Sequence, residues 1–358
     1  MPHSHHSHSG QFCRHAKDQL EEVVLEAIRQ GFEVFGLSEH APRYRVEDLF
    51  PEESDLSPRA LAETYDSFLL VAADLRRKYA EQITLLLGLE TDWITPLDSN
   101  GISRTLVSHP EIDYIVGSVH HVRGVSIDFD RDTWLRSVWQ ARQPTESSTM
   151  RPSSSSSNAP PTLIPLDPSV AEQQSGYTPS LTELRPFLLA YLDAQYDLLK
   201  THQPEVIGHF DLCLLWTPGV VLRSDELEGV WDKVERNIRY AIGYGALFEA
   251  NAAAIRKGWT TSYPSREILR CILDGGGRIC LSDDSHGVSY VGLNYLRMRD
   301  YLVGEGVRDV WHLVRASDRR EGDQVVGGRG SVVARRLSEW ESHPFWPKLE
   351  AAQAGRRV

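Results

Sequence analysis

The amino-acid sequence predicts an α/β fold with a parallel sheet, because short apolar runs alternate with longer amphipathic stretches. A length of 358 residues allows two domains, or one α/β barrel of about 250 residues with insertions. The runs expected to form strands are Val34–Leu37, Ile83–Leu89, Tyr114–Val119, Val206–Gly208, Ala246–Glu249 and Ile279–Leu281. The expected helices cover 17–30, 58–82, 181–202, 225–243 and 265–274. The first should end at Gly31, and the second should begin at Ser57 with Pro58 in its first turn.

Two segments depart from this alternation. Residues 143–180 contain 10 Ser and 7 Pro in 38 positions, too few apolar side chains to offset the entropy of ordering the chain. We predict a mobile surface insertion without a catalytic role, the alternative being an interdomain linker. Candidate metal ligands on both sides favour an insertion into one catalytic domain over 1–320. From about Glu321, with GGRG at 327–330, we expect a soft C-terminal extension over 321–358.

Composition excludes several classes of function. Lys and Arg number 38 against 50 Asp and Glu, a net charge of −12, which argues against nucleic acid or an anionic membrane as partner. No run approaches the roughly 18 apolar residues of a membrane helix. The polar N-terminus does not resemble a signal peptide, and the four scattered cysteines follow no disulfide or zinc-ribbon spacing. We therefore expect a cytoplasmic protein, of an oligomeric state that the sequence does not predict.

Residues able to bind metal follow nearly every predicted strand. A single histidine there is more often a hydrogen-bonding surface residue, and the N-terminal histidines alone would fit a polar tail or a tag. Repetition at five strands favours a metal site, because the carboxyl ends of parallel strands meet at one edge. His6 and His8 are two apart, so on a strand they share a face. The candidates are His6, His8, His15, Glu39-His40, Glu90, His120-His121, His209, Asp211, Asp283, Asp284 and His286.

Read together, these motifs resemble the PHP (polymerase and histidinol phosphatase) superfamily, most closely its fungal histidinol-phosphatase branch. The matching motifs are H-x-H at His6–His8, S-E-H at Ser38–His40, G-L-E at Gly88–Glu90, G-S-V-H-H at Gly117–His121, I-G-H-F-D at Ile207–Asp211 and D-S-H at Asp284–His286. The resemblance covers roughly residues 3–142 and 180–300. It implies a distorted (β/α)7 TIM-like barrel with a trinuclear metal site at the carboxyl ends of the strands.

The resemblance also assigns ligands to three ions. The first set is His6, His8, Glu90 and Asp284; the second is Glu90, His120 and His209; the third is His15, His40 and His286. Imidazole and carboxylate ligands suit Zn, Fe or Mn, and we expect two to three divalent ions per chain. Glu39, His121, Asp211 and Asp283 are expected to orient ligands, although Asp283 would equally serve strand-end amides.

The implied activity is hydrolysis of the phosphate monoester L-histidinol phosphate. Glu90, Asp284 and His286 are the expected catalytic residues, because closely spaced ions acidify a shared water and bind the phosphoryl oxygens. Arg256 matches a family arginine for the substrate phosphate. Asp128 and Asp130 are candidates for the cationic part of the substrate, a role in the strand turn being the alternative.

One departure from the family puts the substrate in question. Leu214 replaces an arginine that usually follows the G-H-x-D motif. Arg123, Arg223 or Lys257 would have to substitute for it, or phosphate binding is weaker. Two other functions therefore stay open: another small-molecule phosphatase or phosphodiesterase on the same fold, and a catalytically weak paralogue that binds metal.

Overall fold

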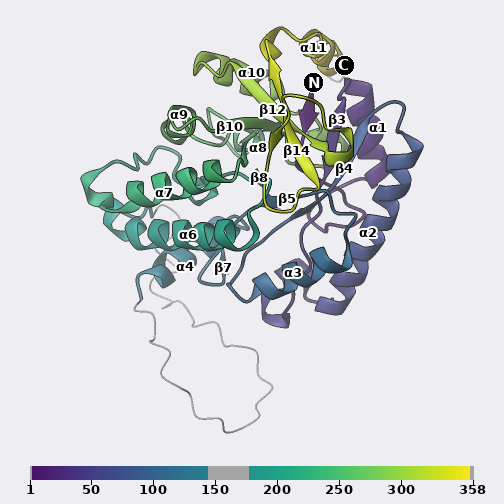
Figure 1. Ribbon diagram of the computed structural model, residues 1–358. Coiled ribbons are helices and arrows are strands. Elements are labelled where there is room, and N and C mark those ends of the chain that lie inside the picture. The colour runs from purple at the N-terminus through teal and green to yellow at the C-terminus, as the bar shows by residue number, and fades with distance from the viewer. Residues whose placement is uncertain (1, 144–176, 355–358) are drawn as a thin grey trace.

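The structure, a computed structural model, describes residues 2–143 and 177–354 and is built on seven parallel strands (Figure 1). A short parallel pairing of β2 (Ser7–His8) with β11 (Ser285–His286) joins the two edges of the sheet, so the predicted barrel is confirmed. The seven strands, in their order around the barrel, are β1 (His3–Ser4), β3 (Val34–Leu37), β4 (Thr84–Glu90), β5 (Tyr114–Gly117), β8 (Val206–Ile207), β9 (Leu247–Asn251) and β10 (Arg278–Ser282).

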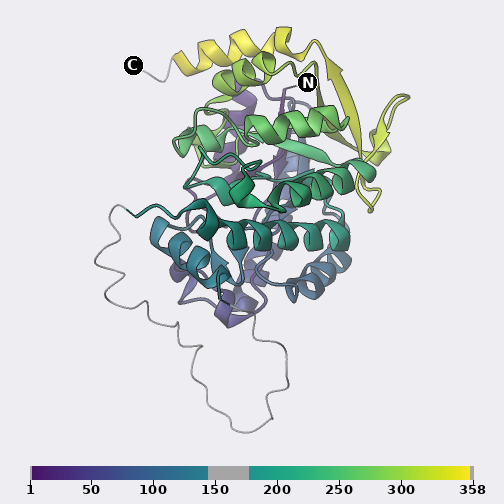
Figure 2. The same cartoon turned by 90° about the vertical axis from the view of Figure 1, so that its left-hand side faces the viewer.

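Helices cover the outside of this barrel (Figures 1 and 2). The two predicted helix boundaries are confirmed: Gly31 ends α1 with a φ of 87°, and the Ser57 hydroxyl accepts a hydrogen bond from the Ala60 amide at the start of α2. The helices are α1 (Leu20–Gln30), α2 (Pro58–Lys78), α3 (Asp98–Ser108), α4 (Arg131–Ala141), α6 (Leu181–His202), α7 (Val230–Gly243), α8 (Ala253–Arg256), α9 (Arg266–Asp274), α10 (Tyr295–Gly304) and α11 (Phe345–Ala354).

Strand β4 shows how the sequence divides the core into two layers. Leu85, Leu87 and Leu89 belong to the large apolar cluster that the strands share with the helices, whereas Leu86 belongs to a second cluster. This alternation follows from the two-residue period of a strand. Gly88 shares the face of Leu86 because a Cβ there would lie 2.5 Å from the Tyr114 ring. The same face ends at Glu90, which places this carboxylate inside the barrel mouth.

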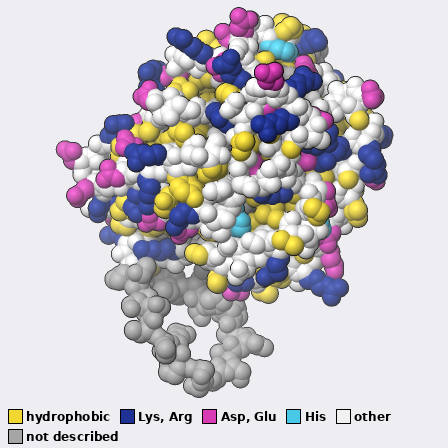
Figure 3. Space-filling model, viewed as in Figure 1, with side chains coloured by type: hydrophobic (Ala, Val, Ile, Leu, Met, Phe, Trp, Pro, Cys, Tyr) yellow, Lys and Arg dark blue, Asp and Glu magenta, His cyan; other side chains and the backbone are white. Residues whose placement is uncertain are grey.

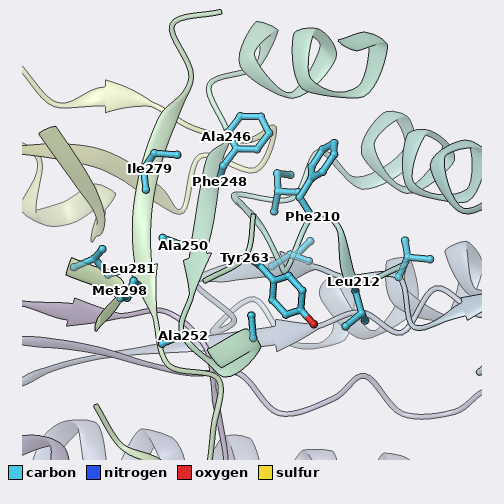
Figure 4. Close-up of a cluster of buried hydrophobic side chains, with 14 of the residues drawn as sticks. Phe210, Leu212, Ala246, Phe248, Ala250, Ala252, Tyr263, Ile279, Leu281 and Met298 are labelled. Atoms are coloured by element: carbon cyan, nitrogen blue, oxygen red, sulfur yellow. The ribbon is translucent and has the colours of Figure 1, made fainter. Parts of the chain in front are cut away.

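Figure 4 shows a part of the outer layer that lies around β9 and β10. Phe248 and Ala250 of β9 lie beside Ile279 and Leu281 of β10, with which they are paired in register one residue to one residue. All four side chains are at most 2% exposed. This packing fixes the two strands whose ends carry Asn251 and Asp284.

The C-terminal region differs from the soft extension expected after Glu321. Strand β12 (Asp309–Arg315) pairs with β14 (Val332–Ser338) and β14 with β13 (Gln324–Val325), in an antiparallel sheet. Leu313, Val326 and Val332 of this region pack with Leu86 in the second apolar cluster, which closes one end of the barrel. Residue 320 therefore divides a single sheet, and the functional cavity lies at the other end of the strands.

Most of the predicted 143–180 insertion, residues 144–176, lies outside the described residues, and its two ends connect α4 to α6. On the face shown in Figure 3, basic and acidic side chains are interspersed. Among the described helices, none combines the length and the apolar character needed to cross a lipid bilayer.

Candidate metal centre and active site

A cavity of about 270 Å³ opens at the carboxyl ends of the barrel strands. Seven of the nine predicted metal ligands line it, and the other two, His6 and His8, are fully buried. The elements that position them are β2, β4, β11 and the turns after β3, β5, β8 and β10. The lining residues are His15, His40, Phe50, Glu52, Glu90, His120, Ser126, Asp128, Phe129, His209, Arg256, Lys257, Asp284 and His286.

Glu90 is the centre of the histidine cluster. Its Oε1 lies 3.0 Å from His6 Nε2, 3.1 Å from His120 Nε2 and 3.2 Å from His209 Nε2. Its Oε2 lies 3.2 Å from His8 Nε2 and 3.1 Å from His40 Nδ1. Both carboxylate oxygens therefore face imidazole nitrogens, which come from four different segments of the chain.

Asp284 approaches the same cluster from the end of β10. Its Oδ1 lies 3.8 Å from the Nε2 atoms of both His6 and His8, and 3.4 Å from His286 Nδ1. Its backbone is left-handed, with a φ of 49°. The Asn251 amide donates a weak hydrogen bond of 3.3 Å to its other oxygen. The turn thus aims this carboxylate inward.

Among the described residues, these side chains form several groups in which all ligand atoms lie within 4.8 Å of one another. They include His6, His8 and Glu90; His6, His209 and Asp284; His8, His40 and His286; and His40, Asp92 and His120. All nine predicted ligands lie in this one cluster. Their grouping is more interleaved than the three separate sets expected from the sequence, and Asp92 joins them.

A second layer of carboxylates fixes the imidazole rings. Glu249 lies 2.8 Å from His6 Nδ1, Asp128 lies 2.9 Å from His120 Nδ1, and Glu52 lies 2.7 Å from His15 Nδ1. Such partners select the tautomer and leave the other ring nitrogen free for a ligand. Glu39 lies 3.4 Å from His8 Nδ1 and also accepts hydrogen bonds from Ser9.

Sequence reasoning missed three of these carboxylates. Glu249 ended a predicted apolar strand, and a glutamate inside such a run was a usable signal. Asp92 is two residues beyond Glu90 and was recognisable by that spacing. Glu52 lies in a 3-10 turn, Pro51–Glu53, and no sequence pattern connected it to His15.

The other three residues that were expected to orient ligands make different contacts. Asp211 accepts a hydrogen bond from the Ser265 amide at the start of α9. Asp283 accepts hydrogen bonds from the Ser4 hydroxyl and the Gly292 amide, which was the alternative considered for it. His121 is buried and stacks on Phe50, with ring centroids 5.6 Å apart. Of the four, only Glu39 contacts a predicted ligand as expected.

The electrostatics of the cluster follow from its burial and its mixed charges. Burial opposes ionisation of Glu90, yet the imidazoles of His6, His40 and His120 hold the pKa of its carboxyl group well below the ordinary value. In the same way, His120 outweighs burial and lowers the pKa of Asp128. Burial lowers the pKa of His40 to about 4. Glu90 is therefore an anion and His40 a neutral base at neutral pH.

The candidate substrate residues divide into two groups. Arg256, stacked 4.4 Å above the Tyr290 ring, lines the cavity, as does Asp128. Asp130 does not line the cavity. It is exposed, and as the N-cap of α4 its carboxylate accepts a hydrogen bond from the Thr133 amide. The expected substrate role of Asp130 is thus replaced by its alternative, a structural role at the turn.

Of the three cations that could replace the family arginine lost at Leu214, one lies at the cavity. Leu214 is buried in the apolar core. Arg123 binds carbonyl groups of Gln140 and Gln143, and Arg223 stacks on Trp231. Lys257 is the one of the three candidate cations that lines the cavity.

The donor set suits divalent transition metals. Imidazole nitrogen and carboxylate oxygen are the ligands of Zn, Fe and Mn sites. Several inward-facing atoms, among them His6 Nε2, His8 Nε2 and Glu90 Oε2, are buried and make no hydrogen bond to the described protein. Because unpaired buried polar atoms are costly, their convergence fits a site built for cations.

Comparison with known proteins agrees with this geometry. Residues 4–150 match the PHP domain family. A protein of Schizosaccharomyces pombe named "probable histidinol-phosphatase" is 38% identical over 336 residues, which cover 93% of each chain. The chain belongs to the PHP family.

One further relative and one solved structure extend the comparison. The histidinol-phosphatase of Saccharomyces cerevisiae is 27% identical over 379 residues, covering 97% of this chain and all of that one. The histidinol phosphate phosphatase of Lactococcus lactis, solved with zinc, L-histidinol and phosphate, has a TM-score of 0.56 at 16% identity. It covers 92% of this chain and 98% of its own, and at that identity it supports the fold alone.

Proposed function

We propose that this protein is a metal-dependent phosphomonoesterase that hydrolyses L-histidinol phosphate to L-histidinol and phosphate. The observation that carries the proposal is the buried Glu90 carboxylate, within 3.2 Å of five imidazole nitrogens at the barrel mouth. Near full-length relationship to fungal histidinol-phosphatases supports the choice of substrate. The four free cysteines support a location in a reducing compartment such as the cytoplasm.

The metal content is part of the proposal. We assign two to three divalent ions of Zn, Fe or Mn to His6, His8, His15, His40, Glu90, His120, His209, Asp284 and His286. When bound, such ions acidify a water molecule and neutralise charge on a phosphoryl group. Glu90 would screen the repulsion between neighbouring cations, since each of its oxygens faces a different set of imidazoles. Glu249, Asp128 and Glu52 would hold the rings in the binding tautomer.

The substrate would be held from two sides. Arg256 and Lys257 line the cavity and supply positive charge for the phosphate oxygens. Phe50 and Phe129 line the same cavity with apolar ring surface, suited to an imidazole. Asp128 would attract a cationic amine. Asp284 and His286 lie close enough to the same opening to assist departure of the leaving alkoxide.

A panel of phosphate esters tests the proposal against its rivals. Metal-loaded protein should release phosphate from L-histidinol phosphate much faster than from glycerol phosphate, serine phosphate or a phosphodiester. A different preferred ester would establish another small-molecule phosphatase. Bound metal with no phosphate release from any ester would establish a metal-binding paralogue.

A further inference from the structure

A cysteine lies among the candidate metal ligands, where the sequence predicted only imidazoles and carboxylates. Cys13 follows β2 in the turn that leads to α1, and its amide donates to the Ser9 carbonyl. The thiol is buried, with Sγ 3.1 Å from His15 Nε2. The ligand atoms of Cys13, His15 and His40 all lie within 4.8 Å of one another.

His15 and His40 turn one ring nitrogen each toward the same point. Glu52 lies 2.7 Å from His15 Nδ1, which leaves His15 Nε2 as the ring nitrogen available to a ligand. His40 Nδ1 lies 3.1 Å from Glu90 and 3.4 Å from Asp92, so His40 Nε2 is the nitrogen on the side of His15. The two Nε2 atoms are 3.3 Å apart. Two ring nitrogens at that separation are stabilised either by a shared proton or by a bound cation.

The spacing resembles the edges of a tetrahedral metal site. Zinc–nitrogen bonds of about 2.05 Å and a zinc–sulfur bond of about 2.3 Å give edges of roughly 3.4 Å between nitrogens and roughly 3.6 Å from sulfur to nitrogen. The observed separations are 3.3 Å between His15 and His40 and 3.1 Å from Cys13 to His15. A small cavity of about 30 Å³ borders Cys13, so Sγ has room for a shift of this size.

We propose that Cys13 binds as a thiolate to the metal position shared by His15 and His40. This rests on the metal-dependent function proposed above and adds a soft ligand to one of its positions. On binding, the sulfur–hydrogen bond breaks, its proton passes to solvent, and a sulfur–metal bond forms without a change of oxidation state. The thiolate favours zinc over manganese at this position.

Cobalt substitution provides a test that does not depend on turnover. Metal-free wild-type protein and a Cys13→Ser variant are titrated with Co²⁺ and followed by absorption spectroscopy. The wild type should develop a near-ultraviolet thiolate-to-cobalt charge-transfer band, which Cys13→Ser should lose while the weaker visible bands remain. Cys271→Ser, a change in the partly exposed thiol of α9, is the matched control and should keep the near-ultraviolet band. Cys13→Ser should also weaken zinc retention against a chelator by at least about tenfold.

Each outcome of the titration decides the matter. The sulfur ligand would be overturned if the wild type developed the visible cobalt bands without the near-ultraviolet band. It would also be overturned if the near-ultraviolet band survived in Cys13→Ser. Neither result would overturn the metal-dependent function. Absence of all cobalt bands, together with no phosphate release, would overturn both. If circular dichroism shows that Cys13→Ser is unfolded, Cys13→Ala replaces it, and absence of the near-ultraviolet band in the wild type would by itself overturn the sulfur ligand.

Discussion

Replacing Glu90 by glutamine tests the centre of the site with the smallest change of shape. Oε1 faces three imidazoles and Oε2 faces two, all within 3.2 Å. The amide keeps one oxygen, so either two or three of these imidazoles face an NH₂ group in place of an oxygen. The negative charge that would separate neighbouring cations is lost as well.

The expected loss is large because Glu90 would act on both metal binding and turnover. We expect phosphate release to fall at least about a hundredfold, in line with the removal of one group that stabilises transition-state charge. That factor corresponds to about 2.7 kcal/mol of transition-state stabilisation. Metal content should fall by about one ion per chain or more, and a chelator should lower the melting temperature less than in the wild type, because bound metal stabilises the folded state.

Three measurements on the same sample suffice: elemental analysis, phosphate release from L-histidinol phosphate, and thermal unfolding with and without chelator. Glu228→Gln is the control, because its side chain is 88% exposed and does not line the cavity. If Glu90→Gln retained wild-type metal content and wild-type turnover, Glu90 would be a structural carboxylate and the proposed metal centre would be refuted.

Three further predictions follow from neighbouring groups. Asp128→Asn should lower kcat by about 10- to 100-fold with a smaller effect on KM, because His120 loses the partner that orients it; steady-state kinetics would contradict this if KM alone changed. Lys257→Met should raise KM for the phosphate ester at least about tenfold, whereas Arg123→Met should not, and equal effects would remove Lys257 as the replacement for the family arginine. Burial lowers the pKa of His312 to about 3, below its unfolded value of about 6.5, so unfolding free energy should decrease as pH falls through this window. His312→Gln should weaken that dependence in urea unfolding of metal-free protein at pH 7 and 4.5, and parallel curves would contradict it.

The sequence by itself determined the fold class and the members of the candidate site. Apolar runs such as Val34–Leu37 identified strands because burial on both faces leaves an uninterrupted hydrophobic signal, and β3 has these same bounds. The candidate ligands were recognisable because parallel strands bring their carboxyl ends to one edge, whatever the details of packing. Helices α3, α4 and α10 were missed, since they are 10 or 11 residues long and their apolar periodicity is weak.

Only the tertiary structure decided which groups share a contact. His6 and Glu249 are 243 positions apart, and the register of β9 and β10 and the closure of the barrel bring them to 2.8 Å. Local sequence carries no record of such a distance. Likewise, the C-terminal residues read as a soft tail because glycines interrupt them, yet β14 becomes ordered by pairing with β12 and by covering the open end of the barrel. Spacing reports which face a side chain occupies, whereas its partner depends on how distant segments pack.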